Sequence, residues 1–397
     1  MKVSIIIPII EITDYLRESI PEILKLDHDD IEIIVIPNEM PTEKWLAPDM
    51  PDTSRGGQAK IKIIPNGNNN ASEKRNIGVK NATGEIVAFL DDDAYPKKDW
   101  LKNALKHFKE TPIGHSESHQ GEESHTKISS NSDSSPANEA GQNDNGNHNI
   151  VAVGGPAITP ESDNVFQKSS AAAFESFIGG GATRNRYLPV GKNRDIDDWP
   201  SVNLLVRRDV FVKTGGFDKR YWPGEDTKLC LELLKYGKIV YEPNAIVYHH
   251  RRGSLIKHLR QIGNYGLHRG HFARLYPQNS LKLTYLIPSL FFIYLVLILI
   301  IEILNLFGIS DLPTGKAGFG FLNYLLFDIW VLLFPILLYF AIMFFDLLII
   351  SVRYRNPLVG LATIPYIFFT HIYYGLRFIK GYFSRDISKS THGKKSQ

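Results

Sequence analysis

Three adjacent carboxylates end an apolar run in the segment "IVAFLDDDAYP", residues 86 to 96. Neighbouring carboxylates repel one another, so each needs water, a donor or a cation to stay ionised in a partly enclosed place. Their oxygens are hard ligands that suit Mg²⁺ or Mn²⁺, ions that commonly bridge protein carboxylates to phosphate. Asp91, Asp92 and Asp93 are therefore candidates for holding a diphosphate-bound cation, and the alternative is a solvated acidic turn capping a helix at Lys97.

A second group of residues that could act in catalysis or metal binding lies further along the chain. Glu225 and Asp226 follow a "WPG" turn and open a predicted helix, "EDTKLCLELLKYG", so Asp226 is placed like a general base. His249 or His250, at the end of an apolar strand, could complete a metal shell. Taken singly, the acids are explained by helix capping and either His by a strand-end surface position. Only the combination favours a site.

These residues need a framework, and the segment from Lys2 to about Lys109 predicts one. Short Ile- and Val-rich runs alternate with helix-like stretches, which is typical of an α/β fold with a mostly parallel sheet and flanking helices. The predicted strands are "KVSIIIP", "IEIIVIP", "KIKIIP" and "EIVAFL", and Ser72 and Gly84 are expected to cap and end a helix between the last two. The acidic run follows the fourth strand at its carboxyl end, where open α/β sheets bind ligands.

Residues 111 to 149 interrupt this pattern with Ser, Asn, Gly, Glu and His and almost nothing to bury. Such a segment is predicted to be a disordered insertion, and a histidine metal tract is the less favoured alternative. Ordered patterns resume at "NIVAVGGPAITP", so we expect one catalytic domain over residues 1 to 280.

Three apolar segments, residues 283 to 301, 329 to 350 and 357 to 379, each have about the 20 residues that cross a bilayer. They predict a helical membrane region over 281 to 380, followed by a basic polar tail over 381 to 397. Three spans with a cytoplasmic catalytic domain keep Arg353 and Arg355 inside but put the tail outside, against the positive-inside rule. An interfacial segment in place of one span would remove this conflict.

Composition narrows the remaining classes. The net charge of +3 gives little support to nucleic-acid binding, so no nucleic-acid partner is expected. Cys230 is the only cysteine, which excludes an intrachain disulfide and disfavours a zinc site built from cysteines. The first apolar run is short and broken by Pro8 and Glu11, so it is interpreted as a strand and not as a signal peptide.

The order of motifs resembles the family 2 glycosyltransferases with the GT-A fold over about residues 2 to 275, without the insertion. The matching segments are "VSIIIP", "KRNIGVKNATGEIVAFLDDDAYP", "VGGP", "VNLLVRRDVF", "WPGEDTKLCLELLKYG" and "YHHRR". The resemblance implies an inverting transfer of a sugar from a nucleotide-diphosphate donor to an acceptor hydroxyl, with Mg²⁺ or Mn²⁺ as cofactor. The acidic run resembles the family's DxD-type element.

The resemblance also implies residue roles. In the family pattern Asp93 would be a direct metal ligand, Asp91 would face the ribose and the metal, and His249 would be a further ligand. Asp226 resembles the catalytic base and Glu225 its neighbour facing the acceptor. The implied donor-binding residues are Pro8, Glu39, Arg75, Asn76, Asp91 and Asp92.

The chain also departs from the family pattern. It has "VIPNEM" where many members have an Asp pair, so Asn38 or Glu39 would have to substitute. The "QxxRW" element of processive synthases is absent, and the nearest stretch is "QIGNYG", residues 261 to 266. We therefore expect transfer of one sugar or a few, to a glycan or lipid-linked acceptor reached at the membrane face.

Other functions stay open at this point. A polyprenyl-phosphate sugar synthase would use the same site, and a non-catalytic nucleotide-sugar-binding scaffold would explain the missing Asp pair. The spans could also merely tether an enzyme with a soluble acceptor. Basic residues before the first span either attract anionic head groups or reflect ordinary positive-inside bias: Arg251, Arg252, Lys257, His258, Arg260, His268, Arg269, His271, Arg274 and Lys282.

Overall fold

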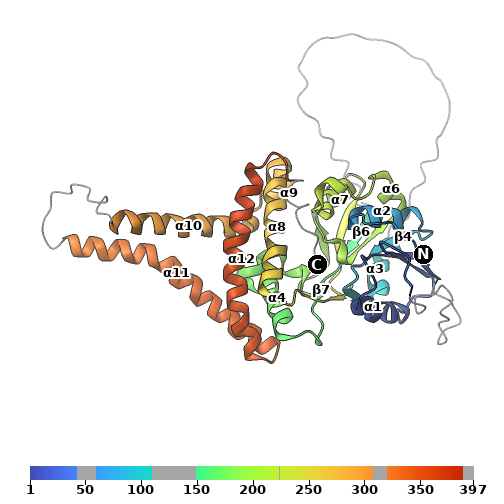
Figure 1. Ribbon diagram of the computed structural model, residues 1–397, viewed down its shortest axis with the longest axis horizontal. Helices are drawn as coiled ribbons and strands as arrows, with labels where there is room; N and C mark the ends of the chain where they lie inside the picture. The colour runs from blue at the N-terminus through green and yellow to red at the C-terminus, as the bar shows by residue number, and fades with distance from the viewer. Residues whose placement is uncertain (43–59, 110–148, 223, 307–319, 388–397) are drawn as a thin grey trace, which may run out of the picture.

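The computed structural model describes the chain except for residues 43–59, 110–148, 223, 307–319 and 388–397 (Figure 1). The predicted disordered insertion, apart from Asn149, and most of the predicted basic tail lie outside the described residues. An α/β layer structure occupies one end of the molecule, and long helices extend from it (Figure 1).

The main sheet has eight strands in the order β3-β2-β1-β4-β9-β6-β10-β8. Its strands are β1 (Val3–Pro8), β2 (Ile31–Ile36), β3 (Lys60–Ile63), β4 (Ile86–Phe89), β6 (Ile150–Gly154), β8 (Arg194–Ile196), β9 (Leu204–Arg207) and β10 (Lys238–Tyr241). Four pairings are parallel and three are antiparallel, because β9 and the edge strand β8 run against their neighbours. The prediction of a mostly parallel sheet and of its first four strands is confirmed.

Both faces of this sheet are covered by helices, as its nearly unbroken apolar strands require. Ile5 and Ile7 of β1 belong to one core cluster, with α1 (Asp14–Leu24) and α3 (Trp100–Lys109). Ile6 points the other way into a second cluster, which includes residues of α2, α6 and α7. Those helices are α2 (Ala71–Lys80), α6 (Arg208–Lys213) and α7 (Glu225–Leu233).

One predicted helix cap is wrong. The side chain that caps α2 is that of Asn70, which accepts a hydrogen bond from the backbone N–H of Glu73. Ser72 is the second residue of the helix and is fully buried. The helix ends at Lys80, and Gly84 serves a different need, since a Cβ there would lie 2.6 Å from the backbone nitrogen of Ser4.

A small second sheet lies at the end of β4 and has the order β5-β11-β7. Its strands are β5 (Ala94–Pro96), β7 (Ala157–Ile158) and β11 (Val247–His249). β11 runs antiparallel to β5 with His249 opposite Ala94. This pairing of distant segments brings the strand-end histidine beside the acidic run.

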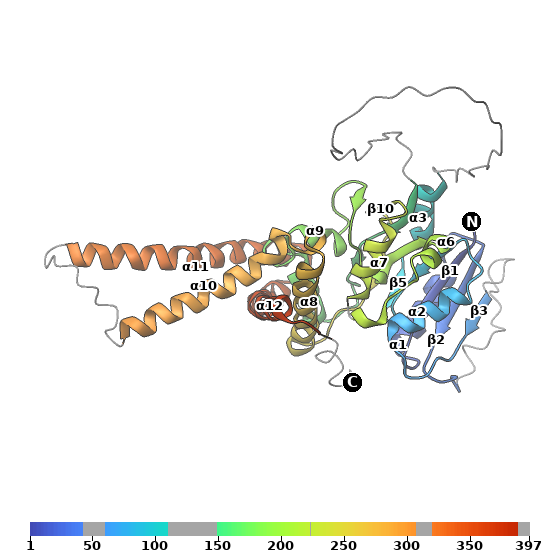
Figure 2. The same cartoon turned by 90° about the horizontal axis from the view of Figure 1, so that it is seen from above.

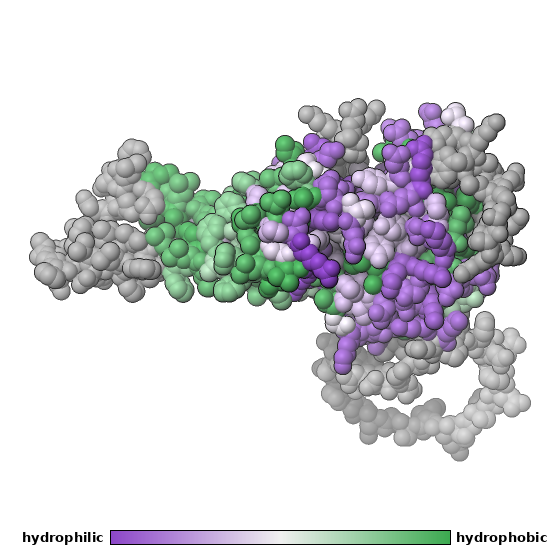
Figure 3. Space-filling model, turned by 90° about the horizontal axis from the view of Figure 1, so that it is seen from below, coloured by the Kyte–Doolittle hydropathy of each residue, from purple (hydrophilic) through white to green (hydrophobic). Residues whose placement is uncertain are grey.

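Within the described residues, three helices are long and apolar enough to cross a membrane: α10 (Leu283–Leu306), α11 (Gly320–Arg353) and α12 (Pro357–Phe383). α10 and α11 lead away from the sheet, and the described part of their surface is strongly apolar (Figures 1 and 3). α12 instead packs along α8 (Leu255–Leu275) and against α4 (Val165–Glu175), two helices that the sequence analysis assigned to the catalytic domain. α5 (Phe177–Gly180) also contacts α11 and α12.

Candidate active site

The acidic run lies between the two sheets. β4 ends at Phe89 and β5 begins at Ala94, so the three aspartates occupy the short connection between them. Because Ala94 pairs with His249, the His249 imidazole reaches Asp93, with 3.0 Å between Nε2 and Oδ1. One ligand atom each from Asp91, Asp93 and His249 lies within 4.8 Å of the others. The structure therefore brings together the three residues predicted to bind metal.

The environment shifts the pKa values of Asp92 and Asp93 in opposite directions. Burial favours a raised pKa for Asp93, but His249 and Arg252 outweigh it and hold that pKa well below its usual range. Arg252 lies 3.3 Å from the other carboxylate oxygen of Asp93. Burial and the two neighbouring carboxylates raise the pKa of Asp92 to about 7. Asp93 is thus ionised at neutral pH, as a metal ligand must be.

The donor set fits a divalent cation, with one condition on His249. Mg²⁺ prefers a set of oxygen ligands, which the two carboxylates supply in part. The imidazole is a known ligand of first-row metals such as Mn²⁺. However, Arg251 lies 2.9 Å from Nδ1 of His249, and a guanidinium can only donate. In this arrangement the neutral ring carries its proton on Nε2 and donates to Asp93. Ligation through Nε2 requires that the contact with Arg251 give way.

Only one of the two adjacent histidines joins this group. The Nδ1 atom of His250 pairs with Asp163, and its Nε2 atom lies 2.9 Å from Glu18. Burial alone would lower the pKa of His250, but these two carboxylates raise it. Both ring nitrogens are engaged away from the acidic run, so the structure selects His249 as the candidate ligand.

Arg75 connects the acidic run to the second predicted group. One guanidinium nitrogen lies 2.6 Å from Asp91 and another lies 3.1 Å from Glu225. Its side chain is only 5% exposed, and although burial disfavours the charge, Asp91 and Glu225 raise its pKa further. A buried cation that bridges two acids fixes their relative positions. The start of α7 is therefore held against the acidic run.

Asp226 has the properties expected of a base near neutral pH. Its Oδ1 atom is buried and, among the described residues, has no hydrogen-bond partner. Burial and the neighbouring Glu225 raise its pKa to about 7, against the opposing effects of Arg75 and Ser201. A carboxylate with a raised pKa and an unsatisfied oxygen is suited to accept a proton from a bound hydroxyl.

Asp198 is a site-supporting residue that the sequence analysis missed. Its carboxylate accepts from the hydroxyl of Thr227 at 3.0 Å, and Thr227 directly follows Asp226. The other oxygen binds Arg269 of α8 at 2.6 Å and Arg186 at 3.0 Å. These two cations hold the pKa of buried Asp198 well below its usual range. The position of the predicted base is thus linked to α8.

The predicted donor-binding residues are placed unequally. Pro8 ends β1 and is buried, whereas Glu39 is exposed. The side-chain amide of Asn76 donates to the carbonyl oxygen of Phe217 at 2.8 Å and accepts from the backbone N–H of Phe217 at 2.9 Å. Asn38 accepts a hydrogen bond from the buried ammonium of Lys74, a residue that the sequence analysis did not single out. Contacts of all these residues with a donor stay predictions.

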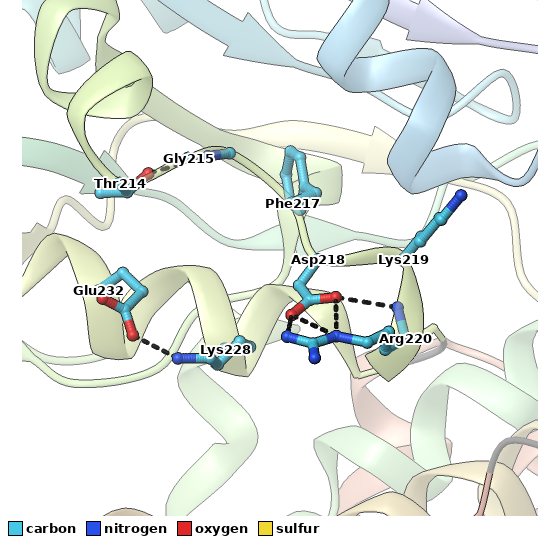
Figure 4. A pocket seen from close by; sticks show the side chains of 9 residues that line it. Thr214, Gly215, Phe217, Asp218, Lys219, Arg220, Lys228 and Glu232 are labelled. Carbon is cyan, nitrogen blue, oxygen red and sulfur yellow. Dashed lines mark hydrogen bonds and ion pairs between the residues drawn. The ribbon is translucent and has the colours of Figure 1, made fainter.

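A pocket near α7 lies apart from the acidic run. It is lined by residues of the loop from Thr214 to Arg220 and by Lys228 and Glu232 of α7 (Figure 4). Asp218 pairs with Arg220 there at 2.6 Å, and Lys228 pairs with Glu232 (Figure 4). None of the predicted site residues lines this pocket, so it is not part of the candidate active site.

Comparison with known proteins shows which family this chain resembles. Residues 4–162 match the model of Glycosyl transferase family 2. The match covers less than half of the chain, and together with the mixed α/β sheet it makes the chain similar to the glycosyltransferases of this family.

Two curated relatives illustrate the similarity. The chain is 25% identical over 210 residues to a pre-mycofactocin glycosyltransferase of Mycobacterium tuberculosis, a match that covers 53% of this chain and 36% of that protein. It is 22% identical over 311 residues to a dolichyl N-acetyl-alpha-D-glucosaminyl phosphate 3-beta-D-2,3-diacetamido-2,3-dideoxy-beta-D-glucuronosyltransferase of Methanococcus voltae, covering 76% and 82%. The chain thus spans about a third of the first relative and most of the second.

Solved structures are similar at a more distant level. The mannosyltransferase PcManGT from Pyrobaculum calidifontis, in complex with GDP-Man and Mn²⁺, is 15% identical with a TM-score of 0.44, covering 97% of this chain and 88% of that one. TarS 1-349 of S. aureus, in complex with UDP-GlcNAc, is 15% identical with a TM-score of 0.41, covering 68% and 66%.

Proposed function

We propose that the protein is a metal-dependent, inverting glycosyltransferase that moves a hexose-type sugar from a nucleotide-diphosphate donor to the hydroxyl of a lipid-linked or cell-surface glycan. The observation that carries the proposal is the bridge formed by Arg75. It holds a candidate metal group, Asp91 with Asp93 and His249, against the helix start that bears Asp226. A donor diphosphate and an acceptor hydroxyl would then meet between these two groups.

The roles of the residues follow from their charges and burial. A divalent cation, Mg²⁺ or Mn²⁺, held by Asp91 and Asp93 would neutralise charge that develops on the departing diphosphate. Asp226 takes the proton of the acceptor hydroxyl as that oxygen attacks the anomeric carbon, and Glu225 orients the acceptor. The bond from the anomeric carbon to the diphosphate breaks on the opposite face. One displacement of this kind inverts the configuration at that carbon.

A membrane-borne acceptor is the part of the proposal that the helices support. The three apolar helices associate the chain with a membrane, and the Methanococcus voltae relative is named for transfer to a dolichyl-linked sugar phosphate. α8, which contacts the supporting residue Asp198 through Arg269, packs directly on α12. We place the catalytic domain in the cytoplasm, on the side of Arg353 and Arg355, by the positive-inside rule.

The test is turnover of a panel of nucleotide sugars by detergent-solubilised protein with Mn²⁺, with Mg²⁺ and with EDTA. We expect metal-dependent turnover of one donor that is lost in Asp93→Ala. It should be retained in Asp29→Ala, an exposed acid outside the site that serves as a matched control. Failure of every donor to bind or turn over would refute the proposal and favour the non-catalytic scaffold.

Product analysis separates the two enzymatic alternatives. A product with a new glycosidic bond to a sugar hydroxyl supports glycan transfer, whereas a sugar linked to polyprenyl phosphate identifies a polyprenyl-phosphate sugar synthase. A β-linked product from an α-linked donor, or the reverse, shows inversion.

A further inference from the structure

α12 has the composition of a third membrane span, but its direction differs from that of the other two apolar helices. α10 and α11 run along the long axis of the molecule, whereas α12 and α8 lie side by side crosswise to them (Figure 1). In the view turned by 90°, α12 is seen end on while α10 and α11 still extend away from the sheet (Figure 2). If α10 and α11 cross the bilayer, α12 lies in the plane of its surface.

The partner of α12 supports this orientation. α8 carries Lys257, Arg260, Arg269 and Arg274, which cannot be accommodated in the hydrocarbon core without great cost. The two helices are joined along their lengths by polar contacts: His258 with Thr370 at 2.9 Å, Arg377 with the Gly263 carbonyl at 3.1 Å, and His271 with the Ser384 carbonyl at 3.2 Å. A spanning α12 would carry the charged helix into the membrane with it.

Three glycines of α8 make this contact close and continuous. A Cβ at Gly263, Gly266 or Gly270 would lie within 2.6 Å of atoms of Tyr373, Tyr374 or Phe378 on α12. Because these approaches involve backbone carbonyls at two of the three positions, the helices cannot accept side chains there without moving apart. α8 and α12 are therefore held together as one pair, so both helices must lie at the same depth relative to the membrane.

The two faces of α12 differ in polarity. Its most exposed apolar residues follow one another at intervals of three, eight, seven and seven residues and so lie along one helical face: Leu358, Leu361, Phe369, Leu376 and Phe383. Thr370 and Arg377 lie on another face, toward α8. An apolar stripe on one face and hydrogen-bonded groups on another are typical of a helix that lies in the membrane interface.

The length of α10 beyond α12 agrees with this placement. α10 meets α12 near its own beginning, where the hydroxyl of Ser289 donates to the Gly375 carbonyl. The part of α10 from residue 289 to residue 306 is about 27 Å long at 1.5 Å per residue, close to the ~30 Å thickness of the hydrocarbon core. α12 thus lies where the crossing begins.

α11 meets α12 nearer its own end, with Tyr339 bonded to His371 at 2.9 Å. Seven residues further on, the buried carboxylate of Asp346 accepts from the backbone N–H groups of Phe177 and Ile178, at 3.2 and 3.0 Å. The last part of α11 is therefore packed against α5, which also contacts α12.

We propose that α12 is an in-plane helix bound to the lipid surface, that only α10 and α11 cross the membrane, and that the tail after α12 lies on the same side as the catalytic domain. This topology places the α11–α12 turn, with Arg353 and Arg355, and the basic tail on one side, which satisfies the positive-inside rule. It needs neither a donor nor turnover, so it stands or falls separately from the proposed function.

Cysteine labelling tests the proposal on the full-length protein in sealed vesicles. Cys230 is the only cysteine and is buried, so Cys230→Ala gives a background without thiols. Single cysteines replace Lys98 in the catalytic domain, Arg385 after α12, and Ser310, which lies between α10 and α11 in the sequence and outside the described residues. A membrane-impermeant maleimide is added before and after permeabilisation.

The in-plane topology predicts that Lys98→Cys and Arg385→Cys react from the same side and that Ser310→Cys reacts from the opposite side. Reaction of Arg385→Cys from the side of Ser310→Cys would make α12 a third span and overturn the proposal. Reaction of all three from one side would overturn it as well, because α10 and α11 would not cross. If Arg385→Cys does not react even in detergent, Lys394→Cys takes its place and is judged by the same outcomes.

Discussion

Replacement of Asp226 by Asn separates a catalytic base from a structural helix cap. Burial and Glu225 raise the pKa of Asp226 to about 7, and the base works only when it is ionised. With that pKa the ionised fraction is about one tenth at about pH 6 and about nine tenths at about pH 8. We therefore expect kcat/KM of the wild-type protein to rise about tenfold between these values and then to level off.

The substitution should have opposite effects on activity and stability. Asn cannot accept the proton, so we expect a loss in kcat/KM on the order of 10² to 10⁴. Because the pKa of Asp226 is higher in the folded protein than its ordinary value of 3.8, ionising this group costs stability as the pH rises from about 4 through about 7. At about 1.4 kcal/mol per pKa unit, that cost reaches at most about 4 kcal/mol above pH 7, and Asn removes it.

Once a donor is known, two measurements decide whether Asp226 is a catalytic base or a structural helix cap. The first is kcat/KM against pH at saturating Mn²⁺, and the second is Tm of both proteins at about pH 5 and about pH 8, where the gain from Asn should be larger at the higher pH. Glu232→Gln is the control, since Glu232 is a partly buried acid on the same helix that pairs with Lys228 and Lys235. A flat profile, or an Asn variant with wild-type kcat/KM, would refute the base. If the Asn variant loses activity and its Tm also falls, Asp226 acts as a structural helix cap.

Three further substitutions test the surroundings of the base. Arg75→Lys keeps the charge but cannot donate to Asp91 and Glu225 together, so steady-state kinetics should show kcat/KM about 10- to 100-fold lower, equivalent to the ~1.5–3 kcal/mol of a charged hydrogen bond. His249→Ala should weaken Mn²⁺ binding about 10- to 100-fold in titration calorimetry, and an unchanged affinity would remove it from the metal shell. Arg269→Gln should lower kcat with little change in donor KM and reduce the free energy of unfolding by about 3–5 kcal/mol, measured by denaturant unfolding, because buried Asp198 loses one of its two cations.

The sequence predicted the parts of this molecule that short-range patterns determine. The four Ile- and Val-rich strands and the acidic run after β4 can be recognised in the sequence, because each apolar run stops where polar residues follow it. The pairing that sets Ala94 against His249 joins segments more than 150 residues apart, so no local pattern indicates it. The family resemblance supplied that contact instead. The sequence analysis named Ser72 and not Asn70 as the cap of α2. Asn and Ser are both favoured at this position, and the two residues are only two positions apart.

Asp198 was missed, and the direction of α12 was left open between a span and an interfacial segment, for different reasons. Asp198 gains its role from Thr227 and Arg269, which belong to separate elements, and in the sequence it is one acid of "DIDDWP". The orientation of α12 was hidden because its apolar composition meets the length criterion for a span. The seven-residue spacing of Thr363, Thr370 and Arg377 was the available signal, since it places polar groups on one helical face.

The two proposals together predict how an acceptor reaches the base. Thr227, next to Asp226, is tied through Asp198 to Arg269 of α8, and α8 is packed on α12. If α12 lies in the membrane surface, the base is held at a set height above that surface, suited to an acceptor anchored in lipid. In proteoliposomes at saturating donor, a glycan on a polyprenyl anchor should be used more efficiently than the same glycan without the anchor. This preference should fall in Arg269→Gln, where α8 no longer holds Asp198. Equal use of both acceptors would show that the membrane helices only tether an enzyme whose acceptor is soluble.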